Sequence, residues 1–265
     1  MPYIRIKDKD IYYKEYGQGE PVIFLSGVMM STSSWAPFIN IVSKDYRMIT
    51  VDLIDQGRSS NGDSSYTIDV QVEILKKVVD ELKLENINLV GMSYGGKVAL
   101  AFTVKYQDRV KSLTVSNTDC FTTKIMSKIA EGWYYAASTL DGSIFATTVF
   151  PYIYSYNYYE ENFEDMEEKE RILSKIIDEE WYLRFKRVLK SAMGYSIYDK
   201  LNTIKVPTLI ISSELDILTP IKCQEYIHKG IEGSKWVIIK DAGHGVMFEK
   251  PKEYITTIMD FINNI

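Results

Sequence analysis

Short apolar runs recur along the chain and alternate with stretches in which apolar residues return every three or four positions. Short apolar runs bounded by polar residues are typical of buried strands in a parallel sheet. Spacing by three and four is typical of helices that bury one face. The expected strands are Pro21–Ser26, Arg47–Val51, Ile87–Val90, Leu113–Val115, Thr208–Ile211 and Trp236–Ile239.

Helical patterns fall between these strands and after the last of them. The N-terminal stretch Ile4–Tyr16 instead alternates around Lys7–Asp10, which indicates an antiparallel hairpin. Alternating strands and helices predict an α/β fold, with a mostly parallel, doubly wound sheet and helices on both faces. The expected helices of this core are Ile68–Leu82, Gly96–Tyr106, Ile221–Ile231 and Lys252–Ile262.

One region breaks the alternation, because between about residues 120 and 200 helical spacing continues without an intervening strand. A tyrosine-rich segment, Pro151–Tyr159, and an acidic stretch, Glu160–Glu170, come before a helical pattern over Ile172–Leu189. Carboxylates favour the first turn of a helix, so we expect the acidic stretch to begin a solvated helix.

A helical insertion in an α/β core usually covers the site at the strand ends. We therefore expect residues 1–119 and 201–265 to form the core, and residues 120–200 to form a helical cap or lid. In this arrangement the cap is inserted between the sixth and seventh strands.

Composition excludes several classes of protein. The chain is 46% hydrophobic and 25% charged, with a net charge of -5, which is ordinary for a globular protein and argues against a nucleic-acid groove. No stretch approaches the roughly 18 apolar residues that span a bilayer. The first ten residues lack the apolar core of a signal peptide, so we expect a cytoplasmic protein.

Cysteines and histidines are scarce. The two cysteines, Cys120 and Cys223, are far apart, and reduced thiols are expected. The only histidines are His228 and His244, so Cys/His metal spacing is absent and no metal or other cofactor is expected.

The segment Gly91-Met92-Ser93-Tyr94-Gly95 fits the pattern Gly-x-Ser-x-Gly. Serine and glycine are also ordinary turn formers, but here a strand pattern precedes the serine and a helix pattern follows it. That context is the one in which a sharp strand-to-helix turn presents a nucleophile. Such a turn strains the serine backbone, and Gly91 and Gly95 keep its surroundings small.

A serine hydroxyl needs a base, and a histidine base needs an acid that orients it. His244 lies between two glycines just after the last expected strand, whereas His228 lies near a helix end and is expected to be a surface residue or helix cap. Asp216 follows the strand before and is the preferred acid. Asp119, after Leu113–Val115, is a second candidate.

The order Ser93, Asp216, His244 resembles that of the α/β-hydrolase superfamily, in its cap-containing branch with a serine nucleophile. The resemblance covers nearly the whole chain. It implies an acyl-enzyme mechanism without selecting a substrate. The resembling segments are Pro21–Gly27 for the third strand and oxyanion loop, Val51–Ser59 for the stretch after the fourth strand, Ser212–Pro220 for the acid and Asp241–Pro251 for the histidine.

Two positions depart from the family pattern. The family usually has His-Gly where this chain has Ser26-Gly27, yet the backbone N–H groups of Val28 and Tyr94 are still expected to form an oxyanion hole. The support of that loop must then differ. Asp55 stands where the family often has glycine, and aspartate tolerates a left-handed turn better than most residues.

Apolar residues near these motifs predict a hydrophobic pocket, although many of them belong equally well in a cap core. A small hydrophobic carboxylic ester, lactone or thioester is the preferred substrate, cleaved through an acyl-enzyme on Ser93. Two alternatives stay open: the same triad used for carbon–carbon bond hydrolysis, elimination or acyl transfer, and a ligand receptor with a slow triad. The expected pocket residues are Met29, Trp35, Trp133 and Tyr134.

Overall fold

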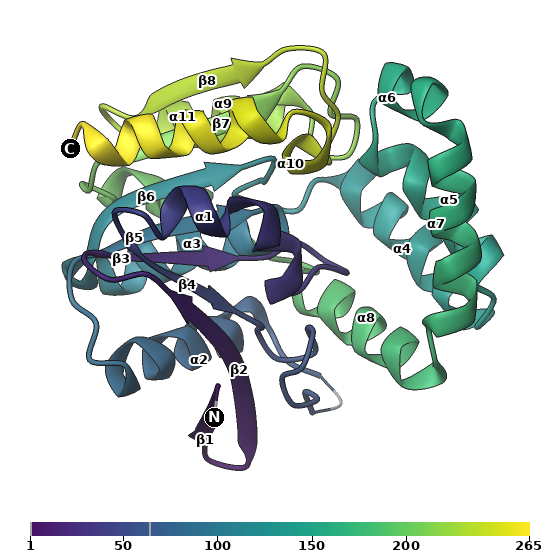
Figure 1. The fold of residues 1–265 in the computed structure, drawn as a ribbon, viewed down its shortest axis with the longest axis horizontal. Coiled ribbons are helices and arrows are strands. Elements are labelled where there is room, and N and C mark those ends of the chain that lie inside the picture. Colours follow the sequence, from purple (N-terminus) through teal and green to yellow (C-terminus); the bar gives the residue numbers. More distant parts are fainter. Residues whose placement is uncertain (1, 64) are drawn as a thin grey trace.

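A sheet of eight strands runs through the part of the chain, residues 2–63 and 65–265, that the computed structural model describes. The strands follow the spatial order β1-β2-β4-β3-β5-β6-β7-β8, and only the pairs β1/β2 and β2/β4 are antiparallel (Figure 1). The strands are β1 (Tyr3–Ile6), β2 (Lys9–Tyr16), β3 (Pro21–Leu25), β4 (Arg47–Val51), β5 (Ile87–Met92), β6 (Val110–Ser116), β7 (Thr208–Ser213) and β8 (Lys235–Ile239).

The parallel strands are in register near their carboxyl ends. Leu25 at the end of β3 pairs with Gly91 of β5, Gly91 pairs with Val115 of β6, and Val115 pairs with Ile210 of β7. The loops that follow these strands therefore leave the sheet at one common edge. In open α/β sheets, this edge is where ligands bind.

Helices cover both faces of the sheet. Apolar side chains of α2, α3 and α9 pack on one face, and those of α1 and α11 pack on the other. The bounds of these helices, with those of the short helix α10, are α1 (Ile39–Val42), α2 (Ile68–Glu81), α3 (Tyr94–Tyr106), α9 (Ile221–Gly230), α10 (Val246–Glu249) and α11 (Pro251–Asn263).

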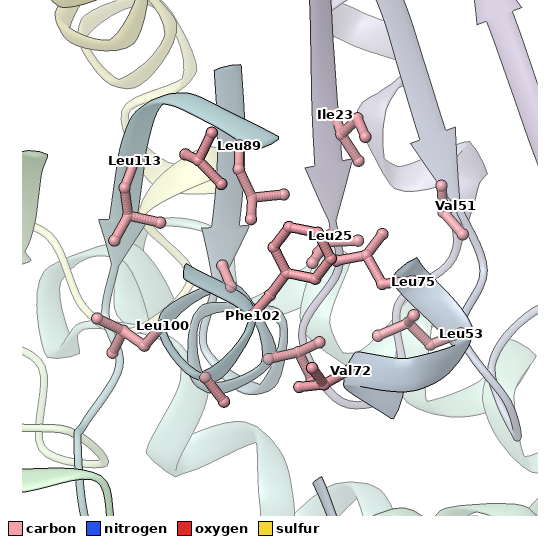
Figure 2. Close-up of a cluster of buried hydrophobic side chains, with 14 of the residues drawn as sticks. Ile23, Leu25, Val51, Leu53, Val72, Leu75, Leu89, Leu100, Phe102 and Leu113 are labelled. Atoms are coloured by element: carbon pink, nitrogen blue, oxygen red, sulfur yellow. The ribbon is translucent and has the colours of Figure 1, made fainter. Parts of the chain in front are cut away.

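Phe102 of α3 lies at the centre of the first of these layers. Figure 2 shows its ring between the strands and α2, close to Leu25 and Leu75. All three side chains are fully buried. Burying one side chain of this size stabilises the fold by roughly 1.5–3 kcal/mol, so this layer fixes α3 firmly beneath the strand ends.

Five helices lie between β6 and β7 in the sequence and stand beside the sheet at the right of Figure 1. Three of them, the first, second and fifth along the chain, share an apolar cluster that contains Trp133, Phe145 and Phe185, separate from the two layers of the sheet. The helices are α4 (Lys124–Ser138), α5 (Gly142–Ile153), α6 (Tyr156–Glu161), α7 (Phe163–Ile176) and α8 (Glu179–Ser191).

The predicted fold class is confirmed: the sheet is mostly parallel, and a helical segment is inserted between the sixth and seventh strands. Each expected strand, the N-terminal hairpin and the four expected core helices are present, with small shifts at their ends. The acidic stretch does place Glu164 and Asp165 in the first turn of a helix, α7. Among the described residues, no helix is long and apolar enough to cross a membrane.

Candidate active site

Ser93 occupies the sharp turn between β5 and α3. Its backbone has φ 52° and ψ -116°, a strained conformation that costs a non-glycine residue about 1–3 kcal/mol. The neighbouring glycines make the turn possible, because a Cβ at Gly91 would overlap the carbonyl of Gly95, and a Cβ at Gly95 would overlap that of Leu25. The turn therefore exposes the serine side chain at the carboxyl edge of the sheet.

A continuous chain of hydrogen bonds joins three loops at this edge. Nε2 of His244 lies 2.9 Å from Oγ of Ser93, and Nδ1 of His244 lies 2.9 Å from Oδ2 of Asp216. A carboxylate accepts from Nδ1–H, which leaves Nε2 free to accept the serine proton. The imidazole is buried, with only 4% of the residue exposed.

The carboxylate of Asp216 is held from several directions. Oδ1 accepts the backbone N–H groups of Leu218 and Thr219, both at 2.8 Å, and Oδ2 accepts the Thr219 hydroxyl at 2.7 Å and the Asn117 amide at 2.9 Å. Burial acts to raise the pKa of this carboxyl. The charge of His244 and the hydrogen bonds from His244 and Thr219 outweigh burial and lower the pKa below its ordinary value.

The structure brings Asp216 to His244 and keeps Asp119 away from it. Asp119 forms a buried ion pair with Lys97 of α3, whose ammonium group also lies 5.2 Å from the centre of the Tyr195 ring. His228 lies in the last turn of α9 and binds the hydroxyl of Ser234 at 2.8 Å. The other acid and the other histidine of the sequence analysis are thus structural.

The loop after β3 brings Val28 to the serine. The N–H of Val28 belongs to the peptide unit whose carbonyl, on Gly27, accepts a hydrogen bond of 2.9 Å from Nε2 of Gln56. Tyr94 begins α3, where backbone N–H groups have no helical acceptor. Within residues 2–63 and 65–265, neither Val28 N–H nor Tyr94 N–H has a protein acceptor outside the helix and strand ladders.

Ser26 replaces the histidine that the sequence analysis expected from the family pattern. Its hydroxyl accepts a hydrogen bond of 2.9 Å from Nε1 of Trp35 and lies 3.3 Å from the Ser31 carbonyl, to which it donates. Trp35 is fully buried against Phe24 and Phe38. We therefore correct the substrate-pocket role predicted for Trp35: it supports the loop from the core, because its indole N–H needs the serine as a partner.

A large cavity opens beside Ser93 and His244. Its volume is about 400 Å³, and its wall is mostly apolar, including Met29 and Trp133. Tyr134 instead meets the ammonium groups of two lysines on α8, away from this wall, so its predicted pocket role is also corrected. Successive residues of a helix point in different directions, so Trp133 faces the cavity whereas Tyr134 faces the lysines. The other residues of the wall include Phe150, Ile153, Leu173, Trp181, Leu218 and Phe248.

Asp55, the second departure from the family pattern, has a left-handed backbone with φ 64°. Its fully buried carboxylate accepts two hydrogen bonds from Nε of Arg187, at 3.0 and 3.1 Å, and one from Nη2 at 2.7 Å. Sequence reasoning missed Arg187. The available signal was the charged side chain of Asp55 at a position where the family often has glycine, since a carboxylate that becomes buried requires an opposite charge nearby.

Arg184, one helical turn before Arg187 on α8, binds the backbone of the same loop through its side chain. Its guanidinium donates to the carbonyls of Gln56, Gly57 and Ser59 at 3.0, 3.1 and 2.9 Å. Helix α8 is thereby fastened to the loop that also supplies Gln56. No cluster of three or more His, Cys, Asp or Glu side chains suited to a metal occurs among the described residues.

Comparison with known proteins identifies relatives of the chain as a whole. The crystal structure of MGS-M2, an alpha/beta hydrolase enzyme from a Medee basin deep-sea metagenome library, has a TM-score of 0.97 and 35% identity, covering 99% of this chain and 98% of that one. The 3-oxoadipate enol-lactonase 1 of Acinetobacter baylyi is 24% identical over 92% of this chain and 89% of its own length.

A third relative is named for a different substrate. The 2-hydroxy-6-oxononadienedioate/2-hydroxy-6-oxononatrienedioate hydrolase of Escherichia coli is 26% identical, over 95% of this chain and 90% of its own. Residues 20–251, most of the chain, match the family described as the alpha/beta hydrolase fold. The protein therefore belongs to the α/β-hydrolase family of enzymes.

Proposed function

We propose that this enzyme is a serine hydrolase that cleaves small hydrophobic carboxylic esters, lactones or thioesters through an acyl-enzyme on Ser93. The observation that carries the proposal is the unbroken hydrogen-bond chain Asp216–His244–Ser93, which ends at the wall of a mostly apolar cavity. A hydroxyl at the head of such a chain is activated for attack on an acyl carbon.

Acylation begins when Oγ of Ser93 forms a bond to the substrate's carbonyl carbon. Nε2 of His244 takes the hydroxyl proton, and the carboxylate of Asp216 stabilises the imidazolium that results. The carbonyl oxygen becomes an oxyanion. Collapse of this intermediate breaks the bond to the leaving group, whose atom takes the proton back from Nε2.

The oxyanion is held by the backbone N–H groups of Val28 and Tyr94. The position of Tyr94 at the start of α3 adds the positive end of the helix dipole. Losing one such donor typically raises the barrier by about 3 kcal/mol. A water molecule, activated by His244, then cleaves the acyl-enzyme and releases the acid.

The helices within residues 120–200 act in this scheme as a cap. Their cluster of aromatic residues contributes Trp133 and Trp181 to the cavity wall, so the cap supplies apolar surface for the substrate and excludes bulk water. The enol-lactonase relative supports a carboxylic ester or lactone as substrate.

Carbon–carbon bond hydrolysis is a second candidate, favoured by the likeness to the dioate hydrolase of Escherichia coli. It uses the same residues on a ketone in place of an ester. Product analysis separates the two, because hydrolysis of an ester yields an acid and an alcohol, whereas hydrolysis of a carbon–carbon bond yields an acid and a fragment whose leaving carbon has gained a hydrogen.

A fluorophosphonate probe tests the proposal without knowledge of the natural substrate. We expect complete, irreversible labelling of Ser93 in the wild-type protein, located by mass spectrometry of its peptides, and multiple turnovers of a chromogenic short-chain ester. The Ser93→Ala variant should fold normally, escape labelling and lose turnover. Labelling elsewhere, or turnover by Ser93→Ala at the wild-type rate, would reject the assigned nucleophile.

A further inference from the structure

Two cavities of unequal size meet at Ser93. The large cavity, described above, contains about 400 Å³ and the small cavity about 70 Å³. Both are bordered by Val28, Ser93 and Trp133, so a group bound to the serine has access to each. His244 belongs to the wall of the large cavity, whereas Thr118 belongs to the wall of the small one.

The chemistry of acyl transfer determines which way each part of the substrate points from Ser93. The tetrahedral carbon on Oγ of Ser93 carries three further groups: the oxyanion, the leaving group and the acyl chain. The oxyanion must meet the N–H groups of Val28 and Tyr94, and the leaving atom must lie within reach of Nε2 of His244 to receive its proton. The acyl chain takes the remaining direction, away from the imidazole.

We infer that the small cavity holds the acyl chain and that the large cavity holds the leaving group. This inference rests on the proposed function and narrows its substrates to short-chain acyl esters or thioesters with a large, apolar leaving group. At about 15–30 Å³ for each non-hydrogen atom, the small cavity accommodates roughly two to five atoms of the acyl chain beyond the serine.

The small cavity also selects for an uncharged acyl chain. Lys97 lies in its wall, but the ammonium group is neutralised by the buried carboxylate of Asp119. The remaining wall is largely apolar, with Met126, Ala130 and Leu189 from the cap helices. An acyl chain with a terminal carboxylate would lose its hydration there without gaining a free cation.

The large cavity suits an apolar alcohol or thiol. Its volume falls within the range of ordinary small-ligand pockets, and the rings of Trp181 and Phe248 offer surface for stacking. Departure of the leaving group vacates the space beside His244. The attacking water therefore enters where the imidazole can take its proton, so one arrangement serves both half-reactions.

Two matched ester series test the assignment. In the first, 1-naphthyl esters keep the alcohol constant while the acyl chain grows from acetyl to butyryl to octanoyl. We expect kcat/KM to fall at least tenfold between butyrate and octanoate. In the second, acetates of ethanol, butanol and hexanol keep the acyl group and the leaving-group chemistry constant, and kcat/KM should rise with the length of the alcohol. The assignment would be overturned if kcat/KM stayed constant or rose as the acyl chain lengthens, or if it stayed constant or fell as the alcohol lengthens.

Variants in the two walls provide an independent readout. Met126→Ala enlarges the small cavity and should raise the octanoate/acetate ratio at least threefold, with the hexyl/ethyl ratio unchanged. Leu173→Ala, in the wall of the large cavity, should change only the hexyl/ethyl ratio. Ala130→Leu fills the small cavity and should lower the butyrate/acetate ratio. If Met126→Ala instead changed only the hexyl/ethyl ratio, and Leu173→Ala only the octanoate/acetate ratio, the acyl chain would lie in the large cavity.

These outcomes are separable from failure of the proposed function. If Ser93 is labelled and esters turn over, but long acyl chains are preferred, the hydrolase proposal stands and the assignment of the cavities fails. If neither labelling nor turnover is seen, the proposed function itself fails.

Discussion

Nε2 of Gln56 donates a hydrogen bond of 2.9 Å to the carbonyl oxygen of Gly27, and this bond fixes the peptide unit that carries the N–H of Val28. In a planar trans peptide, the carbonyl and the N–H point in opposite directions. Together with the N–H of Met30, which donates to the same oxygen at 3.3 Å, Gln56 restrains this peptide unit and with it the N–H of Val28, which borders the cavity at Ser93. The side chain is buried, with 4% of the residue exposed, so water does not compete for this bond.

Replacing Gln56 by methionine should therefore weaken the oxyanion hole without touching the substrate. The shape of the side chain is nearly kept, but its donor is lost. We expect kcat on a short-chain ester to fall by roughly tenfold to a hundredfold, somewhat less than for direct loss of an oxyanion donor. KM should change by less than about twofold. A wild-type kcat for Gln56→Met, measured under saturating substrate, would show that the peptide keeps its orientation unaided.

Asp216 and Asp119 form a matched pair for testing which acid serves His244. Asp216→Asn keeps the size of the side chain but favours the wrong imidazole tautomer, and should lower kcat by about 10⁴. Asp119→Asn should keep kcat within about threefold of wild type while lowering the free energy of unfolding by about 3 kcal/mol, since it leaves Lys97 buried without its charge partner. Steady-state kinetics and urea unfolding separate the two effects, and exchanged results would assign the acid to Asp119.

The lowered pKa of Asp216 predicts how stability depends on pH. A carboxyl whose pKa is lower in the folded than in the unfolded state stabilises the fold above its unfolded pKa, about 3.9, and this contribution is lost as the pH falls through the folded value. The stability difference between wild type and Asp216→Asn should thus shrink as the pH falls below about 4. Urea unfolding at each pH measures it. A difference that grew on acidification would mean that burial dominates and raises the pKa.

The ion pair between Asp55 and Arg187 should be a main attachment of α8 to the core. Arg187→Ala leaves a fully buried carboxylate with less charge compensation and should lower the free energy of unfolding by about 3 kcal/mol. Arg171→Ala is the control, because that arginine and Glu168 are exposed on α7 and their pair contributes about 1 kcal/mol or less. Similar losses for both variants in urea unfolding would contradict a special role for α8.

The sequence predicted the features that are encoded locally. The strands from β3 to β8 were each predicted from a short apolar run, and the turn at Ser93 from two glycines whose positions tolerate no side chain. Ser93, Asp216 and His244 each come shortly after an expected strand, and this sufficed to predict one common edge, because parallel strands end on the same side. These inferences needed only strand direction and turn chemistry.

Features that depend on how the inserted helices pack were beyond such reasoning. Trp133 and Tyr134 are adjacent, and helical spacing alone did not reveal which one faces the cavity. Trp35 was expected at the pocket because it follows the oxyanion loop, yet its ring completes the core beneath that loop. The attachment of Arg187 to Asp55 spans 132 residues and has no local signal beyond the unexpected charge.

His244 follows β8, which is the last strand in the sheet order and has a neighbour on one side only. Its partner Ser93 lies 151 residues earlier, directly after the central strand β5. In the proposed mechanism, Ser93 consequently has no base beside it until the segment that carries His244 has packed against the sheet. Activity should therefore be sensitive to the order of this edge of the sheet. Local unfolding of β8 would displace His244 and abolish catalysis before the molecule as a whole unfolds.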